Sequence, residues 1–475
     1  GGCGKTSLAE MLLFNAGTTT RMGAIEEGTT SLDYEPEETR RRGSVQPACA
    51  TYMWNKNRHF LLDIPGDGNF TGDMECLLKG VDSVVFVLDA VDGVRPLAKK
   101  FWSMVRQAGL PVMIVINKLD RDRADFQMTF DGLSALGIRP VALQLPIRQG
   151  ETFLGVADVL SGKAHMFKPD GSTAEAEIPA GLADDVSLLR DITVENIAES
   201  DEILMEKYLE EGSLPLEDLH DGLRAGVIKG ELIPVLTCSA LENKGGAALL
   251  DAIEALLPSP LDRPAFEGEG GASRTADPEG PVACFVFKTL ADPFVGKLSF
   301  IKVLSGRMTA TSNAVNARTG QPERLGKTLT VCGKKQTDTP EIAAGDIGAV
   351  AKLATAKTGD TLCDPARVVA LPAPVYPISS YRMAVKVAKK GDEGKVGSAL
   401  ARLIEEDPAI RFVVDPETKQ QIISGLGTQH LEVALAKLKN KFGVEITLEN
   451  PRVPYRESIR KSCKAQGRHK KQTGG

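Results

Sequence analysis

Residues 1–13, GGCGKTSLAEMLL, have the types and spacing of a phosphate-binding loop. Gly4, Lys5 and Thr6 open an expected helix and match the second half of the pattern G-x-x-x-x-G-K-[ST], whose first glycine would precede residue 1. Small residues let backbone N–H groups surround phosphate oxygens at the positive end of a helix. Lys5 would bridge the β- and γ-phosphates, and Thr6 would offer its hydroxyl to Mg²⁺. The alternative is a glycine-rich turn before an ordinary helix. The phosphate-binding residues predicted here are Gly1, Gly2, Cys3, Gly4, Lys5, Thr6 and Ser7.

A second stretch, LLDIPGDGNF at 61–70, is an apolar strand that ends in a carboxylate and a Pro-Gly turn. Asp63 would lie beside Mg²⁺, and Gly66 would direct its N–H to the γ-phosphate. The alternative is a structural turn that Asp63 caps. Asp67 comes next, where its charge would repel the γ-phosphate at close range, unless it is an ordinary solvent-facing loop residue. Lys5, Gly66 and Asp67 are therefore the candidate catalytic residues. The turn residues predicted to bind nucleotide are Asp63, Ile64, Pro65, Gly66 and Asp67.

A third stretch, NKLD at 117–120, ends the apolar strand VMIVINKLD. Asp120 would accept two hydrogen bonds from the N1–H and N2–H₂ edge of guanine, which adenine cannot donate, so the site would select GTP over ATP. Asn117 and Lys118 would brace the loop and pack over the base. Ser239 follows the next apolar strand and would complete the base pocket with its neighbours through backbone N–H groups. The base-binding residues predicted here are Asn117, Lys118, Leu119, Asp120, Ser239, Ala240 and Leu241.

These groups need strands that end at one edge of a sheet. FLLDI (60–64), SVVFVLDA (83–90), PVMIVINK (111–118) and LIPVLTCSA (232–240) are near-continuous apolar runs, as expected of parallel strands buried on both faces. Helical stretches lie between them. The pattern predicts a doubly wound α/β domain, interrupted by an acidic, helix-rich insertion.

After the predicted α/β domain, the sequence pattern changes twice. Short β-branched runs punctuated by Gly, Asp and Asn predict a β-barrel, and a later β-α-β-β-α-β order predicts a ferredoxin-like unit. A Pro/Gly-rich stretch at 258–271 reads as a linker. The expected divisions are a P-loop GTPase domain at 1–265 with an insertion at about 166–230, a β-barrel at 275–370, a ferredoxin-like domain at 374–450 and a final segment at 451–475.

Composition limits the class of protein. The 475 residues are too many for one core, and apolar runs such as VVFVL (84–88) are far too short to span a bilayer. The eight cysteines are scattered without a Cys-x-x-Cys pair, which argues against a zinc site or disulfide framework and favours a reducing cytoplasm. Residues 171–220 carry a net charge of −12 and residues 451–475 a net charge of +7. Each is either a solvated face or a partner surface, acidic for a basic protein and basic for nucleic acid.

Together these stretches resemble the translational GTPases, specifically elongation factor G and its paralogues. The resemblance covers essentially the whole chain, and the motifs that carry it are NKLDRDRADF (117–126), LLPSPLDRP (256–264), FKTLADPFVGKLSFIKVLSGRM (287–308), ALARLIEEDPAIRF (399–412), ISGLGTQHLEVAL (423–435), PRVPYRESI (451–459) and KKQTGG (470–475). The first strand of the phosphate loop, the rest of the fourth domain and the fifth domain of that family are not in this sequence. A fragment of a longer protein is therefore expected.

Two positions depart from that family. Its first switch carries a Thr that responds to Mg²⁺ and the γ-phosphate; here the stretch is RRRGSVQPACATYMW (40–54), and Ser44 is the best match, with a slip of one residue onto Val45 left open. The predicted Mg²⁺ ligands are thus Thr6, Ser44 and Asp63. The family's second switch has a His that positions the attacking water, and Asp67 stands in its place.

The resemblance implies a GTPase that works on the ribosome with GTP and Mg²⁺, as a cytoplasmic monomer without a membrane partner. GTP would order the switches, and hydrolysis would drive translocation or ribosome disassembly. Because Asp67 replaces the family His, the alternative is a GTP-dependent paralogue that acts by occupying the ribosome with slow or no hydrolysis.

Overall fold

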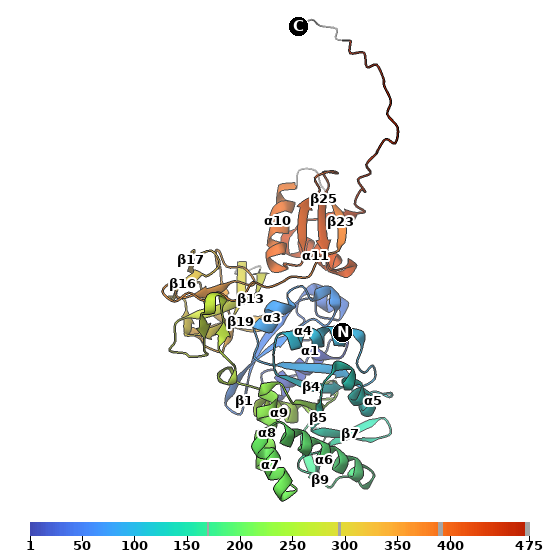
Figure 1. Ribbon diagram of the computed structural model, residues 1–475, viewed down its shortest axis with the longest axis vertical. Coiled ribbons are helices and arrows are strands. Elements are labelled where there is room, and N and C mark those ends of the chain that lie inside the picture. Colours follow the sequence, from blue (N-terminus) through green and yellow to red (C-terminus); the bar gives the residue numbers. More distant parts are fainter. Residues whose placement is uncertain (169–170, 293–295, 388–392, 471–475) are drawn as a thin grey trace.

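A computed structural model of the chain describes residues 1–168, 171–292, 296–387 and 393–470. The first domain is built around a parallel sheet with strand order β3-β4-β10-β5 (Figure 1). Its elements are α1 (Lys5–Asn15), α2 (Pro36–Arg41), β1 (Ala48–Trp54), β2 (Asn57–Asp63), η1 (Gly68–Phe70), α3 (Met74–Lys79), β3 (Val84–Asp89), α4 (Pro96–Gln107), β4 (Val112–Asn117), α5 (Phe126–Asp131), η2 (Gly132–Leu136), β5 (Pro140–Ala142), β10 (Ile233–Thr237) and α9 (Gly246–Leu256).

Strand β4 is buried along its whole length because both faces of the sheet are covered. Met113 and Val115 join the core formed with α1 and α9. Ile114 and Ile116 join the opposite core, formed with α4. This alternation explains why the strand reads as a continuous apolar run, and it confirms the α/β fold class.

Strand β2 differs from the prediction of a parallel strand at 60–64. It pairs antiparallel with β1 and forms a separate two-stranded sheet, and in the described part of the chain no strand bonds its other edge. A cavity lined by Phe60–Asp63 of β2 and Val84–Asp89 of β3 separates the two sheets. Leu61 of β2 is partly buried against the core of the first domain, and Phe60 and Leu62 are partly buried against the core shared with the second domain.

An antiparallel sheet of order β6-β7-β8-β9 precedes the helices of the expected insertion and starts at residue 144. Its strands alternate too weakly to stand out beside the apolar runs of the parallel sheet. The elements of this part of the chain are β6 (Gln144–Gln149), β7 (Thr152–Asp158), β8 (Lys163–Phe167), β9 (Thr173–Ala176), η3 (Ala180–Leu182), α6 (Ala183–Glu199), α7 (Glu202–Glu211) and α8 (Leu216–Lys229).

The second domain is antiparallel β structure. Eight strands form one sheet of order β17-β16-β22-β13-β14-β21-β18-β19, and β15 pairs with β20 beside it. Its elements, with the short ones that precede them in the expected linker, are η4 (Pro260–Asp262), β11 (Phe266–Glu267), η5 (Glu269–Gly271), β12 (Ser273–Arg274), β13 (Ala283–Asp292), β14 (Gly296–Ser305), β15 (Arg307–Thr309), β16 (Asn313–Asn316), β17 (Pro322–Arg324), β18 (Thr328–Cys332), β19 (Lys335–Asp338), β20 (Glu341–Ala343), β21 (Ile347–Ala351) and β22 (Thr361–Cys363).

The third domain has the β-α-β-β-α-β order of a ferredoxin-like unit. Its antiparallel sheet has the order β24-β25-β23-β26, and its two helices pack on each other and on the sheet through one shared core. Its elements are β23 (Tyr381–Val387), α10 (Glu393–Glu406), β24 (Arg411–Val414), β25 (Gln421–Gly425), α11 (Thr428–Phe442) and β26 (Ile446–Glu449).

The three domains contact one another directly. Cys76 and Leu77 of α3 share a core with Phe285 and Phe287 of the second domain. Lys302 of β14, buried to 1% exposure, bonds Asp82 of the first domain at 2.6 Å. Helix α11 lies over the first domain close to α2 and η1 (Figure 1).

Residues 451–470 follow β26 as an exposed segment without helix or strand, which leaves the folded domains (Figure 1). Lys471, part of the predicted basic end, lies outside the described residues. Among the residues that the structure describes, no helix has both the length and the apolar character to cross a membrane.

Candidate functional site

The predicted phosphate-binding loop leads directly into α1. Gly4 precedes the helix in a left-handed conformation with φ of 84°. A Cβ at Gly4 would lie 2.5 Å from the side-chain nitrogen of Asn117, so only glycine fits here. The helix N-terminus therefore lies close to the loop that is predicted to read the base, and its first backbone N–H groups are of the kind that can bind an anion.

The turn after β2 meets the same loop. A Cβ on Gly66 would lie 2.2 Å from Nζ of Lys5, and a Cβ on Gly1 would lie 3.1 Å from the carbonyl oxygen of Gly66. Pro65 is buried beside them. The absence of a side chain at Gly66 thus lets a backbone turn approach the lysine that is predicted to bind phosphate.

The three predicted Mg²⁺ ligands lie together. The Thr6 hydroxyl donates to Oδ2 of Asp63 at 2.6 Å, and the hydroxyls of Thr6 and Ser44 are 3.1 Å apart. Val45, the alternative to Ser44, is instead buried in a small apolar cluster with Phe70 and Val433. Burial raises the pKa of the Asp63 carboxyl, and the charge of Lys5 opposes that rise.

These residues suit a hard divalent cation. Two hydroxyls and a carboxylate are all oxygen donors, the class that Mg²⁺ prefers. Asp33 lies near them and was not predicted. It is buried, its Oδ2 has no hydrogen-bond partner, and burial together with the charge of Asp63 raises its pKa to about 6. Asp33 stands outside every sequence motif, so only its burial beside Asp63 reveals it.

Asp67 has a structural partner. Its Oδ1 accepts from the backbone N–H and the side-chain Nδ2 of Asn69, each at 2.9 Å, and so caps η1. Phe70, at the end of that turn, packs edge-on against His430 of the third domain. The Asp67 carboxylate therefore stabilises the turn. This structural role does not depend on any contact with a phosphate.

The loop that is predicted to read the base is bonded to the predicted phosphate-binding loop. The Asn117 side chain donates to the carbonyl of Cys3 at 2.9 Å, and Lys118 donates to the carbonyl of Gly2 at 2.6 Å. Asp120 accepts from the Ser239 hydroxyl at 2.6 Å through Oδ1. The carboxylate that would read guanine is thus oriented by the second loop of the site.

The predicted backbone contribution of residues 239–241 is only partly available. Ser239 donates its N–H to the carbonyl of Lys244 at 3.0 Å, and Ala240 donates its N–H to Oδ1 of Asn117 at 2.9 Å. Both amides therefore bond within the site in this structure, and the contact of residues 239–241 with a base stays a prediction. Leu119 is fully buried, whereas Leu241 is 59% exposed.

Asp89 was also not predicted. It ends β3, is buried, and accepts from Nζ of Lys118 at 2.6 Å. The signal was present in the sequence, because β3 ends in Asp just as β2 does. Asp89 fixes the lysine that is predicted to pack over the base.

A cavity of about 1530 Å³ begins at the phosphate end of the site. Its walls include Lys5, Thr6, Ser44, Asp63 and Gly66, and it continues between β2 and β3. The sequence-predicted residues thus meet in two groups joined by Asn117 and Lys118, one at the phosphate end and one around Asp120.

Three sequence families match the chain in succession. Residues 2–259 match the elongation factor Tu GTP binding domain, residues 281–365 match elongation factor G domain 2, and residues 372–450 match elongation factor G domain III. The chain is also similar to the crystal structure of ttk003000868 from Thermus thermophilus, with a TM-score of 0.86 and 32% sequence identity. That similarity covers 96% of this chain and 66% of the other.

Proposed function

The chain belongs to the elongation factor G family of translational GTPases, and from this premise we propose that it is a ribosome-stimulated GTPase. It would bind GTP with Mg²⁺, dock on the ribosome, and couple hydrolysis to translocation or to ribosome disassembly. The observation that carries the proposal is the meeting of the phosphate-binding loop with both switch segments, where Thr6 lies within hydrogen-bond distance of Ser44 and Asp63.

The phosphate end would do the chemistry. Hydrolysis transfers the γ-phosphoryl group to water and releases GDP, so catalysis consists mainly of positioning and of stabilising negative charge. Lys5 would neutralise the transferring group, and the Gly66 N–H would bind a γ-phosphate oxygen next to it. Mg²⁺, held by Thr6, Ser44 and Asp63, would supply positive charge at the β- and γ-phosphates.

The base end would select guanine. Asp120 is held by Ser239 with one oxygen and has Arg121 3.6 Å from the other. A carboxylate fixed in this way can accept from the guanine edge without reorganising. Adenine would leave the carboxylate without these hydrogen bonds, and a buried polar group without a partner costs binding free energy.

The proposal is tested by equilibrium binding and by turnover. Fluorescent GTP and GDP should bind in competition with unlabelled guanine nucleotides and not with ATP, and turnover should rise when ribosomes are added. Lys5→Ala should remove turnover, whereas Lys99→Ala, an exposed lysine on α4, is the matched control. Binding of ATP in preference to GTP would contradict the assignment of Asp120.

The role of Asp67 as the cap of η1 supports a second candidate within the same family. A carboxylate that serves as a cap is less suited than a His to positioning water, so the protein could act by occupying the ribosome with slow hydrolysis. Multiple-turnover hydrolysis on ribosomes separates the two. A rate that stays at the ribosome-free value while GTP-dependent ribosome binding persists would favour occupancy.

A further inference from the structure

The segment that presents Ser44 is held from within by one buried acidic side chain. We define the Ser44 loop as residues 33–46. Oε1 of Glu38 accepts from the N–H groups of Val45 and Gln46 at 3.0 and 3.2 Å, and Oε2 accepts from the N–H of Glu35 at 3.1 Å. Glu38 is 1% exposed. Both ends of the loop are thereby tied to one side chain, which makes the loop a unit.

The same loop is held from outside by one face of α11 in the third domain. Nζ of Lys441 lies 2.8 Å from Oε1 of Glu35, and Nζ of Lys437 donates to Oε1 of Gln46 at 3.0 Å. Asn440 donates to Glu37 at 2.7 Å. Residues 437, 440 and 441 are three and four apart and share a helix face. The two lysines thus bind the loop at Glu35 and at Gln46, one on each side of Ser44.

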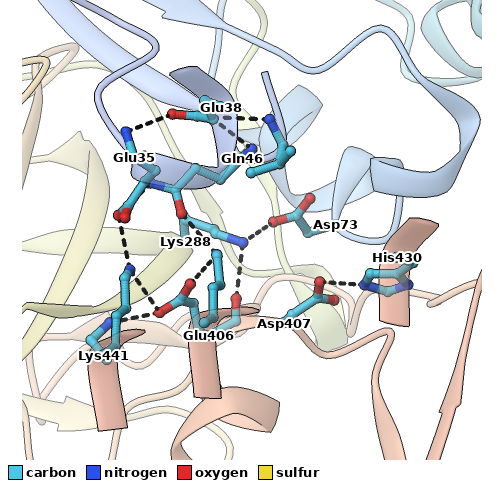
Figure 2. A network of polar contacts seen from close by, with 12 residues as sticks. Glu35, Glu38, Gln46, Asp73, Lys288, Glu406, Asp407, His430 and Lys441 are labelled. Carbon is cyan, nitrogen blue, oxygen red and sulfur yellow. Dashed lines mark hydrogen bonds and ion pairs between the residues drawn. The ribbon is translucent and has the colours of Figure 1, made fainter. Parts of the chain in front are cut away.

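A single carboxylate of α10 faces both lysines. Glu406 is 1% exposed, pairs with Lys437, and lies 3.6 Å from Nζ of Lys441. Burial alone would raise its pKa, but the two lysines hold it at about 2. Figure 2 shows Glu35 of the loop and Glu406 of α10 converging on Lys441.

The charge count of this group depends on the Ser44 loop. With the loop docked, Lys437 and Lys441 face the two carboxylates of Glu35 and Glu406. If the loop moved away, Lys441 would lose its contact with Glu35. Both lysines would then rely on Glu406, with Asp407 as a further acidic neighbour of Lys437, so the buried positive charge would be less well compensated. An uncompensated charge in such a site is costly, so the third domain favours the docked loop.

The second switch touches the same helix. Phe70 packs with Val45 of the loop and Val433 of α11, and the guanidinium of Arg41 lies 5.7 Å from the Phe70 ring centre. The end of α10 is fixed in turn, because Lys288 of β13 donates to Asp73 at 2.6 Å and to the carbonyl of Glu406 at 2.9 Å. Helix α11 therefore packs beside the fixed end of α10 and contacts both switch segments.

We propose that Lys441 and Lys437 are positioning residues for GTP hydrolysis: from the third domain they hold the Ser44 loop so that Ser44 faces Thr6. This inference rests on the proposed function, because it concerns the same phosphate site. A network that merely joins domains would affect binding of GTP and GDP equally. A positioning role matters only when a γ-phosphate is bound, because only then does the position of Ser44 contribute to binding. It should therefore change the affinity for GTP and not the affinity for GDP.

The test is a charge reversal in the full-length protein. Lys441→Glu should weaken binding of the slowly hydrolysed analogue GTPγS by about fivefold or more, leave GDP affinity within about twofold, and lower ribosome-stimulated turnover by about tenfold or more. Lys439→Glu is the matched control on the same helix, because Lys439 pairs with Glu445 and its side chain is 64% exposed. The control should leave all three values within about twofold.

The double variant Glu35→Lys/Lys441→Glu restores the ion pair between positions 35 and 441 with reversed sense, but it leaves a carboxylate at position 441 beside Glu406, so it should return the ratio of GTPγS to GDP affinity part of the way to the original. If Lys441→Glu gives no folded protein, Lys441→Gln should shift the ratio in the same direction by a smaller factor. An unchanged ratio, or a shift that the double variant does not reduce, overturns the proposal. The affinity ratio remains readable even if the unaltered protein proves not to hydrolyse GTP, so this failure is distinct from failure of the proposed function.

Discussion

Replacing Asp67 separates the shape of the second switch from its chemistry. Asp67→Ala removes the oxygen that accepts from Asn69 N and Nδ2, each at 2.9 Å. Loss of a capping acceptor costs about 1 kcal/mol, which is roughly fivefold in the population of the ordered turn. Lys5 and Gly66 are unaffected, so GTP affinity should stay within about threefold.

Asp67→His should have the opposite effect on hydrolysis. The change removes a negative charge beside an anionic transition state and introduces a donor. A hydrogen bond to a charged group contributes about 1.5–3 kcal/mol. After the cap loss of about 1 kcal/mol, roughly 0.5–2 kcal/mol remains, so ribosome-stimulated turnover should rise by about two- to thirtyfold.

The assay pairs equilibrium binding of fluorescent GTP with multiple-turnover hydrolysis on ribosomes. Asp67→Asn is the control, because an amide oxygen can still accept from the Asn69 N–H while the charge is gone. Loss of nucleotide binding in Asp67→Ala would refute the reasoning, since it would make Asp67 a ligand of the metal or nucleotide. Loss of turnover in Asp67→His would also refute it, since the carboxylate would then orient the water.

Three further outcomes are expected. Asp120→Asn should weaken GTP binding by about 1–3 kcal/mol for each hydrogen bond lost and favour xanthosine nucleotides; competition among GTP, ATP and XTP measures this, and an unchanged GTP preference would mean that another group reads the base. Neutralising Arg468, Lys470 and Lys471 should weaken ribosome binding and flatten its dependence on salt, whereas an unaltered slope would leave this end as solvated surface. Glu406 has a folded pKa of about 2 against an ordinary 4.5, so its contribution to stability is present above pH 4.5 and lost as the pH falls towards 2; Glu406→Gln should remove this part of the acid dependence of the urea midpoint, and an identical acid dependence would contradict the pairing.

The parts of the fold that sequence predicted well have strong local patterns. The run VMIVIN became β4 because both faces of a parallel strand are apolar, and the third domain followed its alternation of strands and helices. The partners of β2 could not be read in the same way. An apolar strand shows that it is buried but not which strand lies beside it, and β2 pairs with β1.

The site shows the same division. Glycine and lysine spacing placed Lys5 near Gly66, and the order of motifs brought Asn117 to the phosphate-binding loop. Contacts between distant segments could not be predicted, because no periodicity in the sequence links Glu35 to Lys441 across some four hundred positions. The cap formed by Asp67 was not predicted, because an aspartate at this position is compatible both with a role in the chemistry and with a hydrogen bond to Asn69, two residues further on.

The central claim is that this chain is a GTPase which the ribosome stimulates. The most direct measurement is multiple-turnover hydrolysis of GTP by the full-length protein at increasing ribosome concentration, with Lys5→Ala as the inactive reference. The rate should rise with ribosome concentration to a plateau and stay at background in the variant. A rate that ribosomes do not change, in a protein that still binds GTP, would contradict it.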